Sequence, residues 1–252
     1  MARSTRIGTA LGVVVLAAAY GALSPLIAQR GAQAPAAPAP AAPAAPAAAA
    51  PPELPPALLF REPFQQVAAA VAVPTSPRKG AGPYWLAAQN AVTNPNVELK
   101  LYGADAKNLT VYIHEGRADL WTGLVGSPIA VMVKHRGNFL DLTGLARVRG
   151  IVRTGNLHSL HPVIRLADGT LAAGTQVIDT GGEFLQVEVA FANQRWFTLE
   201  ADTLAVKGQV MKVDLARVDE VGFVDLAPAG GHGSSGWANI STIEVYAKPV
   251  RR

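Results

Sequence analysis

Short runs in which apolar and polar residues alternate recur along the chain from Val97 onward. In the run Ile240–Lys248, Ile243 and Val245 share one face while Glu244 lies on the other. A period of two is typical of a β-strand that has one face in a core and the other in solvent. The runs that predict strands are Leu58–Phe64, Val97–Tyr102, Leu109–His114, Ile129–Lys134, Arg147–Arg153, Leu160–Leu166, Phe184–Phe191, Arg195–Glu200, Leu204–Val206, Glu220–Leu226 and Ile240–Lys248.

The connections between these runs contain glycine or proline, and Ala167–Thr170 (ADGT) is a strong turn signal. No stretch after Tyr84 shows a helical period of usable length, and no strand–helix–strand rhythm appears. Many short strands with tight connections are typical of two packed antiparallel sheets. The sequence therefore predicts an all-β fold over residues 57–252, an antiparallel β-sandwich of the jelly-roll kind.

The N-terminal part has a different composition. Residues 1–28 combine a basic start at Arg3 and Arg6 with the apolar run Leu11–Ala19, which predicts a secretory signal cleaved after Ala28. An uncleaved membrane anchor is the alternative, because the longer segment Ile7–Ala28 could span a bilayer. Residues 29–56 are dominated by alanine and proline and predict a disordered, extended linker. Both interpretations predict an exported chain, periplasmic or extracellular, which would touch a membrane only through that anchor.

Charge is distributed unevenly along the chain. The formal net charge is +4, but residues 91–252 hold sixteen basic and sixteen acidic residues, so the excess belongs to the N-terminal part. A nucleic-acid-binding domain needs a basic patch of its own. Because residues 91–252 carry no excess of basic residues, no nucleic-acid partner is expected. Arg147, Arg149 and Arg153 share one face of a predicted strand, which we interpret as a solvated sheet face. The chain has no cysteine, which excludes disulfides, thiol catalysis and cysteine-bound zinc.

Three segments carry a resemblance to a known fold family: Leu140–Val152 (LDLTGLARVRGIV), Val218–Phe223 (VDEVGF) and Ile243–Tyr246 (IEVY). Together they resemble galactose-binding-like β-sandwich domains, of the complex I intermediate-associated type and of the type found in carbohydrate-binding modules. The chain also looks similar to an exported bacterial protein family of unknown role, through Asn94–Gly103 (NPNVELKLYG) and Leu120–Gly123 (LWTG). The resemblance implies a β-sandwich that binds sugars, binds proteins or has no ligand.

Recognition of a sugar needs an aromatic face and polar groups that form hydrogen bonds. The C-terminal Gly-rich loop carries His232 and Trp237 between two predicted strands, and tryptophans there and elsewhere supply rings. Each tryptophan is also a candidate core residue. The predicted ligand-binding residues are Trp237, His232, Asp225, Arg165, Trp196 and Asn239. The function predicted is non-catalytic binding of a carbohydrate or a cell-envelope glycan.

Two other functions stay open at this point. A sugar-acting hydrolase would need two carboxylates facing each other across a cleft, with His232 nearby; a His232–Asp225 pair could act in acid–base chemistry, but no nucleophile motif accompanies it. A cell-envelope scaffold or protein-interaction domain would need no ligand site. His158 and His161 stand three residues apart on a non-helical segment, and two imidazoles do not complete a metal site. No cofactor or catalytic residue is predicted; the resemblance implies at most a structural Ca²⁺.

Overall fold

The computed structural model describes residues 53–65, 72–73, 84–86, 91–114, 117–210, 212–227 and 236–252. They belong to one compact unit, Ala50–Arg252. The predicted signal and most of the predicted linker lie outside the described residues, as does His232. No helix in the described part of the chain is long and apolar enough to cross a membrane.

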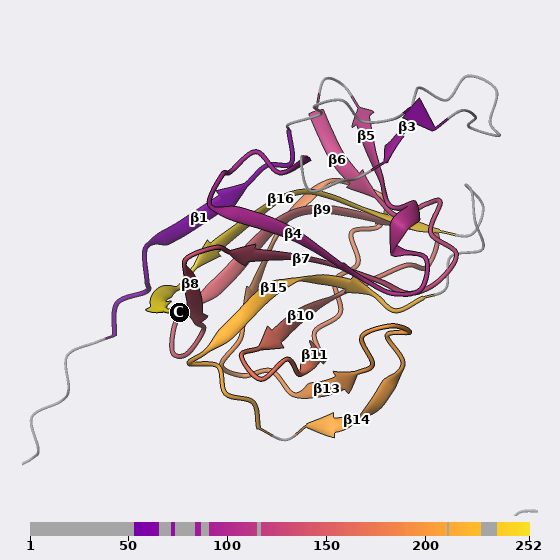
Figure 1. Cartoon of the computed structure of the whole chain (residues 1–252). Helices are drawn as coiled ribbons and strands as arrows, with labels where there is room; N and C mark the ends of the chain where they lie inside the picture. The colour runs from indigo at the N-terminus through magenta and orange to yellow at the C-terminus, as the bar shows by residue number, and fades with distance from the viewer. Residues whose placement is uncertain are drawn as a thin grey trace, which may run out of the picture. The chain divides into compact units, whose positions relative to one another are not determined.

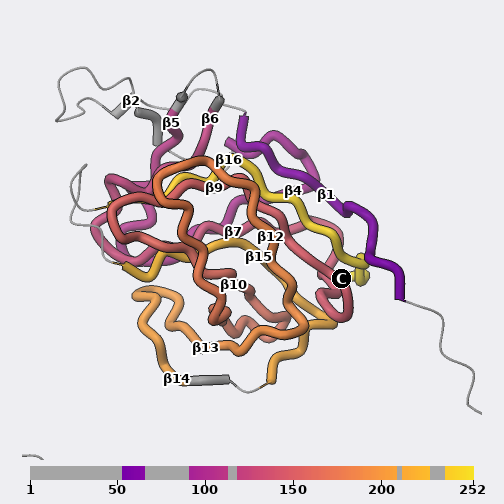
Figure 2. The backbone as a smooth tube through the Cα atoms, turned by 180° about the vertical axis from the view of Figure 1, so that it is seen from behind, coloured from indigo at the N-terminus to yellow at the C-terminus, as the bar shows by residue number. Residues whose placement is uncertain are grey.

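Two antiparallel sheets form the described structure (Figure 1). Sheet A has the strand order β12-β9-β16-β6-β5-β3-β2, and β1 pairs with β16. Its strands are β12 (Leu185–Ala190), β9 (Arg147–Gly155), β16 (Trp237–Tyr246), β6 (Arg117–Trp121), β5 (Thr110–His114), β3 (Tyr84–Leu86), β2 (Ala72–Val73) and β1 (Leu58–Glu62). Figure 2, seen from behind, brings β12, β9 and β16 into view.

Sheet B fans across Figure 1 from β4 to β14, in the order β14-β13-β11-β10-β15-β7-β4, with β8 and β17 attached beside β15. Its strands are β14 (Val206–Val210), β13 (Trp196–Leu199), β11 (Leu171–Gly174), β10 (Leu160–Leu166), β15 (Val218–Asp225), β7 (Ile129–His135), β4 (Val97–Tyr102), β8 (Asn138–Asp141) and β17 (Lys248–Arg251). The connection between β4 and β5 contains the 3-10 turn η2 (Ala106–Asn108). The predicted all-β antiparallel sandwich is confirmed.

The main core lies between the two sheets. Alternate residues of each strand supply it: Val221 and Phe223 from sheet B meet residues such as Val148 and Ile243 from sheet A, and all four are fully buried. The intervening residues of β9 are only partly buried, which confirms the solvated face predicted for its arginines. The two-residue period therefore sorts the side chains of sheet A into core and surface.

A second, smaller apolar cluster lies on the opposite face of sheet B. On β7, Val131 and Val133 join the main core, while Ala130 and Met132 join this second cluster. Leu204, from the connection between β13 and β14, belongs to it and is 2% exposed. The chain therefore covers the centre of this outer face of sheet B with its own residues. The outer face of sheet A, in contrast, presents polar and aromatic side chains.

Candidate functional site

The strands on either side of the Gly-rich loop lie in different sheets. β15 ends at Asp225 in sheet B, and β16 begins at Trp237 in sheet A. The chain therefore changes sheet between Asp225 and Trp237. This crossing brings the end of β15 and the start of β16 close to the connection between β9 and β10, which also passes from sheet A to sheet B.

Asp225 forms a buried pair with His158 of that β9–β10 connection. Nδ1 of His158 lies 2.6 Å from Oδ2 of Asp225, and the side chains are 4% and 3% exposed. The second carboxylate oxygen accepts the backbone N–H of Ala227 at 3.1 Å. Burial raises the pKa of Asp225, and the contact with His158 partly opposes that rise. The partner of Asp225 in the described structure is thus His158, which the sequence offered only as a weak metal ligand.

His161 does not act together with His158. Its Nδ1 lies 3.2 Å from the carbonyl oxygen of Gly174, on the neighbouring strand β11. Among the described residues no group of three histidine, aspartate or glutamate side chains is arranged to hold a metal ion. The structural Ca²⁺ implied by the resemblance stays a prediction.

Two glycines shape the start of β16. Gly236 has φ +96°, and a Cβ there would overlap the imidazole of His158. Gly155 pairs with Trp237 across β9 and β16, and a Cβ on Gly155 would stand 2.8 Å from Cζ2 of the Trp237 ring. The indole therefore lies over Gly155 on the outer face of sheet A. His158 and the two glycines together fix where Trp237 enters the sheet.

The strand register places further residues on the same face as Trp237. Val152 and Ile240 are paired and buried in the core, so the next pair along, Arg153 and Asn239, faces outward. Asn239 is also paired with Trp121 of β6. The outward residues form what we call the Trp237 surface, which consists of Asp119, Trp121, Arg153, Phe184, Trp237 and Asn239.

Polar atoms of Asn239 and Arg153 at the Trp237 surface have no hydrogen-bond partner in the described structure. Asn239, 4% exposed, donates its side-chain N–H to Oδ2 of Asp119, while its own Oδ1 is buried without a hydrogen-bond partner. Nε of Arg153 is also buried without a partner. The guanidinium carbon of Arg153 lies 5.7 Å from the centre of the Phe184 ring and 6.0 Å from that of Trp237. One acceptor and one donor therefore stand beside aromatic rings, unsatisfied by the described protein.

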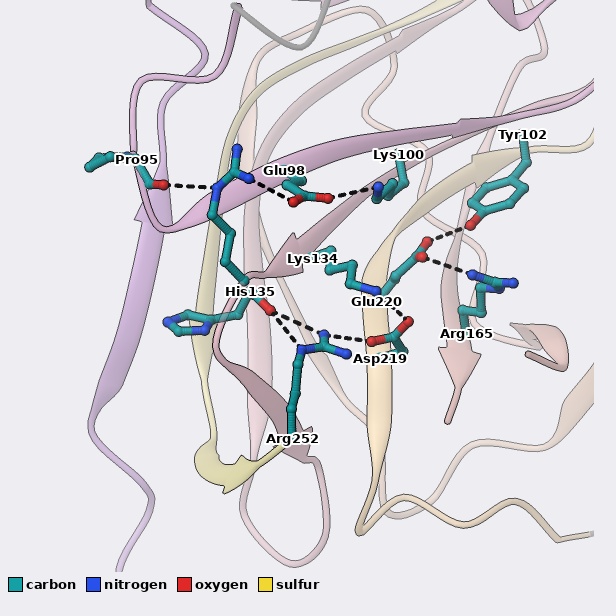
Figure 3. A network of polar contacts seen from close by, with 11 residues as sticks. Pro95, Glu98, Lys100, Tyr102, Lys134, His135, Arg165, Asp219, Glu220 and Arg252 are labelled. Atoms are coloured by element: carbon teal, nitrogen blue, oxygen red, sulfur yellow. Dashed lines mark hydrogen bonds and ion pairs between the residues drawn. The ribbon is translucent and has the colours of Figure 1, made fainter. Parts of the chain in front are cut away.

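Arg165, another predicted ligand residue, lies on the outer face of sheet B in the polar network of Figure 3. Its Nη1 contacts Oε1 of Glu220 at 3.2 Å, and the hydroxyl of Tyr102 donates to Oε2 of the same carboxylate at 2.7 Å. Glu220 is fully buried, so this network satisfies a buried charge. Burial and the neighbouring carboxylate raise the pKa of Tyr102 above its ordinary value. Arg165 therefore neutralises Glu220 and does not join the Trp237 surface.

Trp196 corrects the sequence-based prediction. Its side chain is 2% exposed and belongs to the main core, where its ring stacks on Phe191 with centroids 6.0 Å apart and planes 6° from parallel. Trp196 is a packing residue and presents no face to a ligand.

Of the predicted ligand residues, the structure brings Trp237 and Asn239 together on one face. Asp225 is buried behind them with His158, Arg165 and Trp196 lie elsewhere, and His232 lies outside the described residues. Sequence reasoning did not select Arg153. The only sequence signal for it is its place in the alternation of β9, where it shares a face with Arg147 and Arg149.

Comparisons with known proteins give weak structural likenesses. No family model matches the chain, and no curated protein matches it. An exo-β-agarase aligns with 63% of the chain at 10% identity and a TM-score of 0.35, and the match spans 24% of the agarase. A family 11 carbohydrate-binding module from Clostridium thermocellum, in complex with a β-1,3-1,4-mixed-linked tetrasaccharide, aligns with 62% of the chain and 85% of the module at 10% identity and a TM-score of 0.34. A family two carbohydrate esterase from Cellvibrio japonicus aligns with 61% of the chain and 35% of the esterase, at 10% identity and a TM-score of 0.29.

Proposed function

We propose that this chain is an exported, non-catalytic carbohydrate-binding protein and that the Trp237 surface is its binding site. One observation carries the proposal: a half-buried indole stands beside an acceptor (Asn239 Oδ1) and a donor (Arg153 Nε) that have no hydrogen-bond partner in the described protein. Buried polar atoms are satisfied in the great majority of cases, so two unsatisfied atoms beside a partly exposed ring favour a polar ligand that reaches them.

A sugar ring offers the matching chemistry. Its C–H face packs on an aromatic ring, and its hydroxyls both donate and accept hydrogen bonds. Asn239 Oδ1 would accept from one hydroxyl, while Arg153 Nε would donate to an oxygen of the same or the next sugar. The outer face of sheet B offers less, because Leu204 and its neighbours cover its centre and Arg165 already binds Glu220. We propose a carbohydrate or cell-envelope glycan as the partner, met outside the cytoplasm as the N-terminal signal predicts.

The hydrolase alternative receives less support from the described residues. A hollow of about 510 Å³ is lined by two carboxylates, Glu53 and Glu188, together with Arg147. Glu188, however, lies 3.3 Å from Nε of Arg147 and 2.7 Å from Nε of Arg149. Both arginines therefore already engage this carboxylate, which leaves it less free to face a second carboxylate across a cleft. The buried Asp225 is paired with His158 and faces no second carboxylate in the described structure.

The proposal is tested by measuring the binding of the purified full chain to an array of defined glycans, followed by calorimetry on the best ligand. Trp237→Ala should weaken binding at least about tenfold, because a buried aromatic anchor contributes on the order of 2 kcal/mol. Tyr246→Ala is the matched control: this ring lies on the same strand and face, but Arg147 and Arg149 cover it at 4.4 and 5.0 Å. Thermal unfolding verifies that both variants fold.

If the chain unfolds cooperatively but binds no glycan, the proposed function is refuted. Equal weakening by Trp237→Ala and Tyr246→Ala would refute the site.

A further inference from the structure

Arg153 differs from the other arginines of the outer face of sheet A. Arg147 and Arg149 both contact Glu188, at 3.3 and 2.7 Å. Arg61, next to β16, contacts Glu244 at 3.5 Å. Arg153 forms no ion pair with any carboxylate of the described chain, although its Nε is buried. The described protein thus supplies no counter-charge for the arginine that lies beside Trp237.

The neighbouring rings do not replace that missing partner. The Phe184 and Trp237 ring centres lie 5.7 and 6.0 Å from the guanidinium carbon, at the outer limit of a cation–π contact of about 6 Å. A ring at that distance attracts the charge but accepts no hydrogen bond from Nε. A buried charged donor without an acceptor is unfavourable, so an anion that binds there gains both charge pairing and a hydrogen bond.

We infer that the carbohydrate bound at the Trp237 surface is acidic, and that Arg153 pairs with its carboxylate or sulfate group. This inference rests on the proposed function and adds the chemical class of the ligand. The planar guanidinium matches the two oxygens of an oxyanion with parallel hydrogen bonds, and Nε is one of the donors such a pairing uses. Asn239 Oδ1 accepts only from a donor, which a sugar hydroxyl provides.

Asn239 gives the site a direction. It lies on β16, next to β9, which carries Arg153. Arg153 is a cation and Asn239 Oδ1 is an acceptor. An acidic sugar therefore binds with its oxyanion toward β9 and a hydroxyl toward β16, because the reverse orientation would bring the oxyanion against the amide oxygen of Asn239.

The test uses the full chain and a glycan array that holds neutral, uronate-containing and sulfated oligosaccharides. The best uronate ligand is then compared by calorimetry with its methyl ester, which has the same shape without the charge. We expect the acid to bind on the order of 10–100-fold more tightly than the ester. Added salt should reduce that preference, as for any partly exposed ion pair. If sulfated ligands bind best, the matched comparison is with the desulfated sugar.

Two variants assign the preference to Arg153. Arg153→Gln should bind acid and ester equally, because it removes the charge that distinguishes them. Arg149→Gln, on the same strand and face but paired with Glu188, should keep the full preference. Equal binding of neutral and acidic glycans by the wild-type chain would overturn the inference and leave the proposed function standing, and so would a preference that persists in a folded Arg153→Gln variant. Absence of glycan binding by the folded wild-type chain would overturn both.

Discussion

The buried pair of His158 and Asp225 leads to a quantitative prediction. It joins the end of β15 in sheet B to the β9–β10 connection, and His158 in turn contacts Gly236 at the start of β16. Asp225→Ala removes two hydrogen bonds to the carboxylate, from His158 at 2.6 Å and from the N–H of Ala227 at 3.1 Å. Hydrogen bonds to a charged group contribute about 1.5–3 kcal/mol each.

We therefore expect Asp225→Ala, which loses both hydrogen bonds, to lower the free energy of unfolding by about 3–6 kcal/mol. Asp225→Asn keeps one acceptor oxygen and removes the buried charge, so its loss should be smaller, about 1–2 kcal/mol. Urea unfolding of the full chain, followed by far-ultraviolet circular dichroism, measures both. Asp168→Ala is the control, because Asp168 accepts the N–H of Thr170 in an exposed turn and surface changes usually stay within about 0.5 kcal/mol.

The same pair predicts a dependence on pH. Burial raises the pKa of Asp225 above 3.8, so the folded chain keeps this proton to a higher pH than the unfolded chain does. Its contribution to the unfolding free energy is therefore greatest below 3.8 and declines as the pH rises through the window up to the folded pKa. Subtracting the profile of Asp225→Asn from that of the wild type isolates this decline. A flat difference profile, or an Asp225→Ala variant within about 1 kcal/mol of the wild type, would show that the pair does not join the sheets as argued.

Three other substitutions test the packing, each followed by chemical unfolding of the full chain. Gly222→Ala should destabilise by about 3 kcal/mol, because its Cβ would overlap the carbonyl oxygen of Val131 on the adjacent strand, whereas Gly208→Ala, with no atom within 4 Å, should stay within about 1 kcal/mol; equal effects would contradict the packing. Trp196→Ala should lower the free energy of unfolding by about 3–5 kcal/mol, because it removes a large side chain from the core. The glycan affinity of the folded fraction should be unchanged, and a weakened affinity would show that this ring contacts the ligand. Tyr102→Phe should cost about 1–2 kcal/mol, because a buried carboxylate oxygen loses its donor, and a neutral result would mean that solvent replaces the hydroxyl.

Part of the candidate site could be predicted from the sequence. Trp237 and Asn239 were both selected from the sequence, but their shared face depends on β16 beginning at Trp237, three residues before the predicted strand Ile240–Lys248. Arg153 could not be selected, because its pairing with Asn239 depends on the register between β9 and β16, which lie far apart in sequence. Trp196 was selected incorrectly for the same reason, because the sequence does not tell which sheet face its ring occupies until the partner strands are known.

By itself, the sequence determined the all-β class, because a two-residue period and glycine- or proline-bearing connections are local signals. Tertiary structure decided which strands share a sheet. In the segment Ile129–Val133 every residue is buried. Residues on one face of the strand lie in the main core, and those on the other face lie in the second apolar cluster, which covers the outer face of sheet B. Tertiary structure also decided that the Gly-rich loop passes between sheets and that His158 is the partner of Asp225. Such long-range pairs depend on how the two sheets pack, and no local pattern of residues encodes that packing.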